Sequence, residues 1–140
     1  MKKSCFLLCC FILMTSCSND NETEEDFDAT AILGSWKLVR TTFLAADGSP
    51  AEEDFTDKDV IYTFDANGNL EVSNTSPGHA PGSFSYTFTR DFLSSSPGQN
   101  ASEVLVVEIA NTKWAYNSLN GTLLLSLAHI DGPALFFDPQ

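Results

Sequence analysis

Cysteine is confined to the first 17 residues of this 140-residue chain, at Cys5, Cys9, Cys10 and Cys17. Residues 18–140 therefore offer no disulfide, no thiolate ligand for a metal and no thiol nucleophile. Histidine is also scarce, with two residues in the whole chain. Because protein zinc sites are built mainly from cysteine and histidine, this composition argues against zinc, and we expect no metal or other cofactor.

Basic residues are few as well. The chain has 7 Lys and Arg against 19 Asp and Glu, a net charge of −12. Without the first 16 residues, which contain Lys2 and Lys3, 5 basic residues remain against 19 acidic ones, and the net charge is −14. Proteins bind nucleic acids through clustered Lys and Arg that neutralise phosphates. We therefore expect no nucleic-acid partner.

Long hydrophobic runs are absent too. The longest uninterrupted apolar stretch, residues 5–14, spans ten residues, whereas a membrane-spanning helix needs about 20. Lys2 and Lys3 precede this stretch, and the small residues Thr15 and Ser16 follow it. A basic start, a short apolar core and a small-residue end are typical of a secretory signal peptide, which we assign to residues 1–16.

The segment Met14-Thr15-Ser16-Cys17 resembles the lipobox of bacterial lipoproteins, with Met14 in place of the usual leucine. The resemblance implies that Cys17 becomes the first residue of the mature chain and carries the lipid anchor. An ordinary signal peptide, whose cysteines are merely small apolar residues, is the alternative. The anchor would make the membrane a partner of this protein.

Residues 17–28 are predicted to form a flexible acidic tether. A segment with low hydrophobicity and high like charge cannot bury enough apolar surface to offset the entropy lost on ordering. Acidic residues soon after a lipidated cysteine also resemble the export signal of Bacteroidetes surface lipoproteins. We therefore expect an outer-membrane location, and surface exposure or retention on the inner leaflet both stay open. The acidic residues concerned are Asp20, Glu22, Glu24, Glu25 and Asp26.

Residues 29–140 suit one domain in length, and their hydrophobic pattern has a period of two. Phe84, Tyr86 and Phe88 alternate with serine and threonine, as expected for a strand with one buried face. Asn-Gly pairs at 67–68 and 120–121 are typical of tight hairpin turns. The sequence therefore predicts an all-β fold, a small antiparallel up-and-down barrel of seven or eight strands. The predicted strands lie in residues 31–43, 60–64, 70–72, 83–89, 103–109, 113–116 and 121–130.

The stretch AILGSWKLVRTTF, residues 31–43, resembles the first strand of lipocalins, with Gly34 and Trp36 in their Gly-x-Trp motif. The pattern LGSWKLV, YTFDANGNLEVS, WAYNSLNGTLLLSL is similar to lipocalin-like domains of Bacteroidetes lipoproteins. This resemblance implies that Trp36 plugs the closed end of the barrel. Lipocalins cover that tryptophan with a basic residue of the last strand, whose role would fall here to Arg40 or Arg90. The short C-terminal segment leaves open whether the barrel closes.

Four aromatic residues on the predicted inward faces are candidates for lining a pocket. An eight-strand barrel has room for its own side chains or for one small ligand. We therefore expect a binding protein for a small apolar molecule such as a lipid or sterol. The alternative is a structural or interaction protein with a filled barrel that binds a partner protein or glycan on its surface. The candidate ligand-binding residues are Tyr62, Phe84, Tyr86 and Trp114.

The sequence predicts no enzyme. His79 lies in the loop-like segment SPGHAPG and is interpreted as a solvated residue. His129 and Asp131 could share a strand face, as a general base and its orienting carboxylate would, but a strand-end hydrogen bond is the simpler role. No serine stands in a Gly-x-Ser-x-Gly context. Residues 65–71 are interpreted as a hairpin turn, and the acidic residues of 52–59 as a solvated loop, with loose calcium binding as the alternative.

Overall fold

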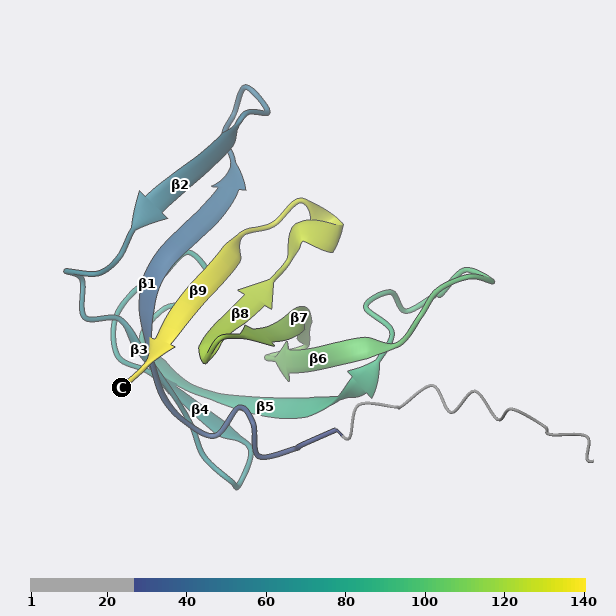
Figure 1. Cartoon of the computed structure of the whole chain (residues 1–140), viewed down its shortest axis with the longest axis horizontal. Helices are drawn as coiled ribbons and strands as arrows, with labels where there is room; N and C mark the ends of the chain where they lie inside the picture. Colours follow the sequence, from purple (N-terminus) through teal and green to yellow (C-terminus); the bar gives the residue numbers. More distant parts are fainter. Residues whose placement is uncertain (1–26) are drawn as a thin grey trace, which may run out of the picture.

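The computed structural model describes residues 27–140, which form nine β-strands and one short 3₁₀ turn (Figure 1). The predicted signal peptide, Cys17 and most of the predicted tether lie outside these residues. No helix in the described part of the chain has the length and hydropathy needed to cross a membrane. The elements are β1 (Gly34–Leu44), β2 (Pro50–Asp54), β3 (Ile61–Phe64), β4 (Asn69–Val72), β5 (Gly82–Asp91), β6 (Val104–Ile109), β7 (Thr112–Leu119), β8 (Thr122–Ser126), η1 (Ala128–Ile130) and β9 (Ala134–Pro139).

The strands form a closed antiparallel barrel. From β3 to β9 each strand pairs with the next in the sequence, and β1 pairs with both β3 and β9. The closing pair runs from Trp36 opposite Pro139 to Thr42 opposite Ala134. The prediction of an all-β up-and-down barrel is therefore confirmed, and the short C-terminal segment supplies the strand that closes it.

The strand β2 is additional to the eight strands of the barrel. It pairs with the second half of β1, beyond the part that pairs with β3, so the β1–β2 hairpin projects from the barrel (Figure 1). The interpretation of residues 52–59 as a solvated loop is wrong for residues 52–54, which belong to this strand. Hydrogen bonds along β1 hold residues 50–54 extended instead.

A β-bulge in β1 reorients its side chains. The register with β9 shifts between Leu38 and Arg40, and both Leu38 and Thr41 have no exposed surface. In a regular strand, residues three apart face opposite sides of the sheet. The extra residue of the bulge therefore lets both side chains enter the interior.

Trp36 lies near the start of β1, where it packs half-buried against the core. Its Nε1 donates a hydrogen bond to the Ile32 carbonyl oxygen at 2.8 Å, so the indole fastens the turn that leads into the barrel. The expectation that Arg40 covers this indole is wrong. The Arg40 guanidinium lies 3.9 Å from the ring centroid of Phe136, because β9 is its direct neighbour.

The alternating strand directions give the barrel two distinct ends. Strands β3, β5 and β7 begin at one end, where the β4–β5 loop (residues 73–81), the β6–β7 turn and η1 also lie. We call this the loop end. Strand β1 begins at the opposite end, with the β3–β4 and β7–β8 turns and the C-terminus, and we call this the Trp36 end.

The predicted Asn-Gly turns are confirmed, but one turn carries no such signal. Gly68 and Gly121 have φ of 82°, and Asn120 has φ of 54°. Between β6 and β7, however, the left-handed positions are Ala110 at 48° and Asn111 at 67°. An alanine in this conformation brings its Cβ too close to the following carbonyl oxygen, which costs about 1–2 kcal/mol.

Ala110→Asn is expected to stabilise the protein, because asparagine adopts the left-handed conformation more readily than alanine. The gain should be on the order of 0.5–1 kcal/mol, below the full left-handed penalty. It is measured as a higher urea midpoint at unchanged m-value. Ala101→Asn is the matched control, since Ala101 is exposed and is not among the positive-φ residues. Equal midpoints for the two variants would contradict a strained turn at Ala110.

Candidate functional site

The β4–β5 loop folds over the interior at the loop end of the barrel. A Cβ added to Gly78 would lie 2.8 Å from Leu135 Cδ1 and 3.1 Å from Trp114 Cη2. Both neighbours are core residues, with 0% and 1% of their surface exposed. Glycine at position 78 therefore lets the loop backbone press directly onto the barrel core.

The same loop inserts the His79 ring among three aromatic side chains. The centroid of the imidazole lies 5.6 Å from that of Tyr62, 5.3 Å from that of Phe84 and 5.4 Å from that of Trp114. These three residues lie near the starts of β3, β5 and β7, so the barrel topology brings them to one end. We call His79 and its three aromatic neighbours the His79 site.

Hydrogen bonds fix the ring and the loop together. Tyr62 Oη lies 3.0 Å from His79 Nδ1 and 2.5 Å from Ser76 Oγ. Ser76 Oγ also accepts hydrogen bonds from the backbone N–H groups of Gly78 and His79, at 3.2 and 3.0 Å. One serine hydroxyl therefore organises the loop, and one tyrosine hydroxyl ties it to β3.

Burial keeps the His79 site uncharged at neutral pH. It lowers the pKa of His79 to about 4, because the charged imidazolium would lose its hydration inside the site. Burial also raises the pKa of Tyr62 to about 12, and the hydrogen bond from Ser76 offsets this only in part. The imidazole and the phenol are both neutral, which suits contact with an uncharged molecule.

Three of the four candidate ligand-binding residues meet at this site, and the fourth does not. Tyr86 lies further along β5, where its ring packs against Phe64 at 5.0 Å. Its hydroxyl donates to the Asp65 carbonyl oxygen at 2.7 Å, in the β3–β4 turn at the Trp36 end. Tyr62, Phe84 and Trp114 therefore form one group, and Tyr86 belongs to another.

The interpretation of His79 as a solvated residue is wrong. Its Pro- and Gly-rich surroundings correctly indicate a loop, but they do not show that the loop turns inward. The sequence reasoning also missed Ser76 and Gly78. The available signal for an inward loop was that small residues surround His79, whose side chain is the one aromatic ring in a segment that lies between aromatic strands.

One polar atom of the site lacks a partner. Trp114 Nε1 is buried and has no hydrogen-bond partner among the described residues. The indole edge that carries this atom also carries Cζ2, which would lie 3.4 Å from a Cβ at Gly78. The loop therefore covers the six-membered ring of the indole, beside the unpaired donor.

His129 and Asp131 do not share a strand face, so the arrangement of a general base with its orienting carboxylate is absent from this pair. Strand β8 ends at Ser126, and His129 lies exposed in η1, with Asp131 in a left-handed conformation just after it. No group of three His, Asp or Glu side chains within residues 27–140 could hold a metal ion. Three acidic residues of segment 52–59 take part in ion pairs: Glu52 with Arg40 at 2.9 Å, Asp59 with Lys37 at 3.0 Å, and Glu53 with Lys58.

The hairpin turn predicted within residues 65–71 is confirmed, and it lies between the end of β3 at Phe64 and the start of β4 at Asn69. Asp65 Oδ1 accepts hydrogen bonds from the backbone N–H groups of Asn67 and Asn69, both at 2.8 Å. The Asp65 carboxylate therefore serves the turn between β3 and β4. The same bonds, together with that from the Asn69 side chain, lower the pKa of this exposed carboxyl.

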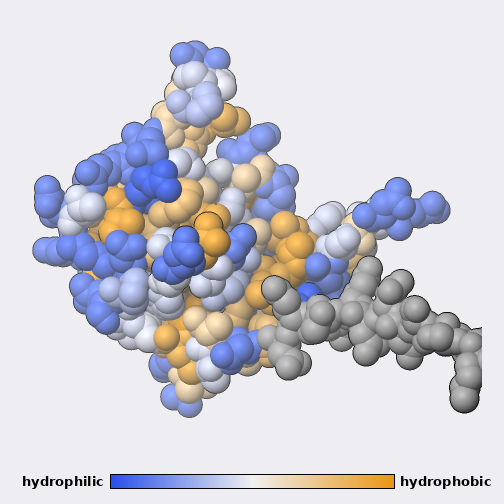
Figure 2. Space-filling model, viewed as in Figure 1, coloured by the Kyte–Doolittle hydropathy of each residue, from blue (hydrophilic) through white to orange (hydrophobic). Residues whose placement is uncertain are grey.

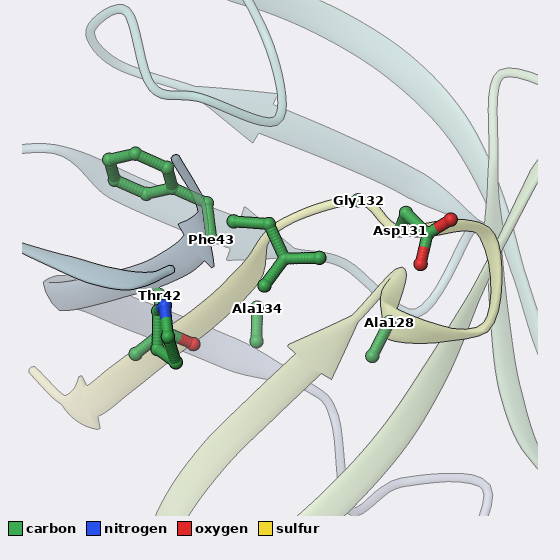
Figure 3. Close-up of a pocket in the computed structure, with 8 residues that line it drawn as sticks. Thr42, Phe43, Ala128, Asp131, Gly132 and Ala134 are labelled. Carbon is green, nitrogen blue, oxygen red and sulfur yellow. The ribbon is translucent and has the colours of Figure 1, made fainter. Parts of the chain in front are cut away.

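A shallow hollow, of about 250 Å³, lies beside the β1–β2 hairpin (Figure 3). Phe43 and Leu44 on this hairpin are 38% and 52% exposed. Figure 2 shows hydrophobic surface just below the projecting tip of the hairpin. The hollow is shallow and open, so it suits contact with a surface more than enclosure of a small molecule. Its lining residues are Thr42, Phe43, Leu44, Pro50, Ala128, Asp131, Gly132 and Ala134.

No family model matches the chain, and no curated protein or solved structure gives a significant match. Inferences about function therefore rest on the residues and their geometry.

Acid should destabilise the protein through His79. The unfolded chain binds a proton at this residue near pH 6.5, whereas the folded protein binds it only near pH 4. Stability is therefore fully present above about pH 6.5 and is lost as pH falls toward 4. Since the ring is partly exposed, we expect His79 to account for about 1–3 kcal/mol of that loss.

The measurement is urea unfolding between pH 7.5 and 4 for the wild type, His79→Phe and His129→Phe. His79→Phe keeps a ring in the site but cannot titrate, so its stability should fall less steeply. His129→Phe should follow the wild type, because His129 is exposed. Parallel curves for all three proteins would show that His79 titrates as if in water.

Proposed function

We propose that this chain is a lipid-anchored lipoprotein of the outer membrane whose barrel binds a small apolar ligand. It acts by binding rather than by catalysis. The observation that carries the proposal is the convergence of Tyr62, Phe84 and Trp114 at one barrel end, around a ring that belongs to a loop. The barrel wall there presents an aromatic surface that a ligand could contact in place of the loop.

The interior limits the size of that ligand. Phe137 packs edge-on against Tyr62 with centroids 4.8 Å apart, and it has no exposed surface. Leu123 and Leu125 of β8 are equally buried in the same core. Side chains of the protein therefore fill the space beyond the His79 site. The ligand that fits best is therefore no larger than the loop tip and the His79 ring together.

The connectivity is compatible with an anchor on the opposite side. Strand β1 begins at the Trp36 end, so the chain from Cys17 enters the barrel there. Phe27, at the start of the described residues, packs against Phe88 of β5 with centroids 5.0 Å apart. The predicted anchor would therefore join the barrel at the end opposite the His79 site.

Lipidation is tested by Cys17→Ser in cells labelled with a fatty-acid probe. The variant should lose the label and its membrane retention, because the sulfur that accepts the lipid is gone. Cys10→Ser is the matched control, since Cys10 lies within the predicted signal peptide, and it should keep both properties. Acylated, membrane-bound Cys17→Ser protein would contradict the lipoprotein assignment.

Ligand binding is tested by thermal unfolding of the purified chain with fatty acids, sterols, hydrophobic dyes and small aromatic compounds. A compound that binds only the folded state raises its stability by RT ln(1 + [L]/Kd), about 2.7 kcal/mol at a hundredfold excess over Kd. We expect the smaller compounds to raise the melting temperature. Flat melting temperatures across the whole set would count against an apolar ligand.

A second candidate function is recognition of a partner protein or glycan on the outer surface. The exposed Phe43 and Leu44 at the hollow beside the β1–β2 hairpin favour it. In the same assay, this function predicts that glycans or a partner protein stabilise the chain. Phe43→Ala should abolish that stabilisation, and His79→Ala should leave it unchanged. The opposite pattern would favour the His79 site.

A further inference from the structure

We propose that the β4–β5 loop is a displaceable plug, and that the space filled by its His79 ring is the position of a small, uncharged, planar aromatic ligand. The proposal rests on the proposed apolar-ligand function and names the ligand class and the element that competes with it. Three independent features of the His79 site carry it: the shape of the space, the attachment of the loop and an unpaired donor.

The shape of the space is that of a flat ring. The His79 ring lies tilted by 37° against the Trp114 indole, and it meets Tyr62 and Phe84 at 74° and 61°. Aromatic pairs favour such offset and edge-to-face arrangements at centroid distances of 4.5–7 Å. Three walls therefore hold one planar ring, and another ring of similar thickness can take its place.

The loop can leave without disturbing the sheet. The hydrogen bonds of Ser76 Oγ to Gly78 and His79 close within the loop. At the tip, the side-chain bonds to the rest of the protein are those of Tyr62 Oη with Ser76 and His79. The base of the loop is held by Asn74 Nδ2, which donates to the Asp59 carbonyl oxygen, and by Ser73 Oγ, which donates to the same oxygen and accepts from the Ile61 N–H. Displacing the loop tip therefore breaks no pairing between strands. Segments held in this way open locally at lower free energy than the sheet does.

The unpaired donor indicates the chemistry of the ligand. Buried polar groups are nearly always hydrogen-bonded, yet Trp114 Nε1 has no partner among the described residues. Gly78 covers the six-membered ring beside this donor, so a ligand that takes the place of the loop would lie next to the indole N–H. Of the rings that face His79, only that of Tyr62 can titrate, and its raised pKa keeps it neutral. An uncharged aromatic molecule with a hydrogen-bond acceptor at its edge matches this site.

The test uses benzimidazole, a neutral planar probe with one acceptor and one donor nitrogen. The chain has 2 Trp, so the protein labelled with ¹⁵N-tryptophan gives two indole N–H signals, which Trp36→Phe assigns. Benzimidazole should shift the Trp114 signal and leave that of Trp36 in place. Decanoate, an apolar probe without a ring, serves as the comparison.

Removing the plug should strengthen binding. A closed loop reduces the apparent affinity by the fraction of open protein, so His79→Ala should bind benzimidazole at least about tenfold more tightly than the wild type. His129→Ala, at the exposed histidine, should bind like the wild type. Gly78→Ala keeps the imidazole but wedges the loop away from Leu135 and Trp114, and it should also tighten binding. Gly98→Ala is its control, since a Cβ there meets nothing within 4 Å.

The outcomes separate this inference from the proposed function. If benzimidazole binds all variants equally, or shifts the Trp36 signal instead, the ligand lies elsewhere and the plug is refuted, while apolar binding stands. If His79→Ala tightens the binding of decanoate but not that of benzimidazole, the proposal of a planar aromatic ligand is refuted. If no apolar compound binds the wild type or either loop variant, both the inference and the proposed function fail.

Discussion

The hydrogen-bonded pairing of β1 with β9 turns an open sheet into a barrel, and the His79 site depends on that closure. Strand β9 carries Leu135, against which the Gly78 backbone rests, and Phe137, which packs beneath Tyr62. An open sheet would leave Trp114 and Leu135 on a solvated face, with no interior for the loop to enter. Closure also removes the free sheet edges at which strands of separate molecules pair.

The uneven strand lengths explain why a loop completes the core. Strands β3 and β4 have 4 residues each, whereas β1 has 11 and β5 has 10. The barrel wall is therefore short at β3 and β4. Without a cover, the aromatic side chains beside these strands would face water at the loop end. The β4–β5 loop covers this gap with a backbone made compact by Ser76 and with one imidazole ring. Its place in the core follows from the shortness of its neighbouring strands.

Local signals in the sequence predicted the barrel, because alternation and Asn-Gly turns act over a few residues. The inward aromatic faces of β3, β5 and β7 were predictable for the same reason. Three features were not, because distant residues decide them. The direction of His79 depends on Leu135, which lies 56 positions further along the chain. The left-handed Ala110 is imposed by the register of β6 and β7. The end of β8 is fixed by the return of the chain to form β9, which leaves His129 in η1 instead of on a strand.

The plugged arrangement contains features that folding alone does not favour. An unpaired buried donor such as Trp114 Nε1 costs about 1–3 kcal/mol, and a phenylalanine at position 79 would avoid placing an imidazole in apolar surroundings. Such local conflicts concentrate at functional sites, where a side chain must serve a second state as well as the folded one. In the His79 site the Trp114 indole and the His79 ring meet where the β4–β5 loop covers the barrel interior. A state with the loop displaced and an acceptor bound would resolve both conflicts, since it pairs the indole and returns the imidazole to water.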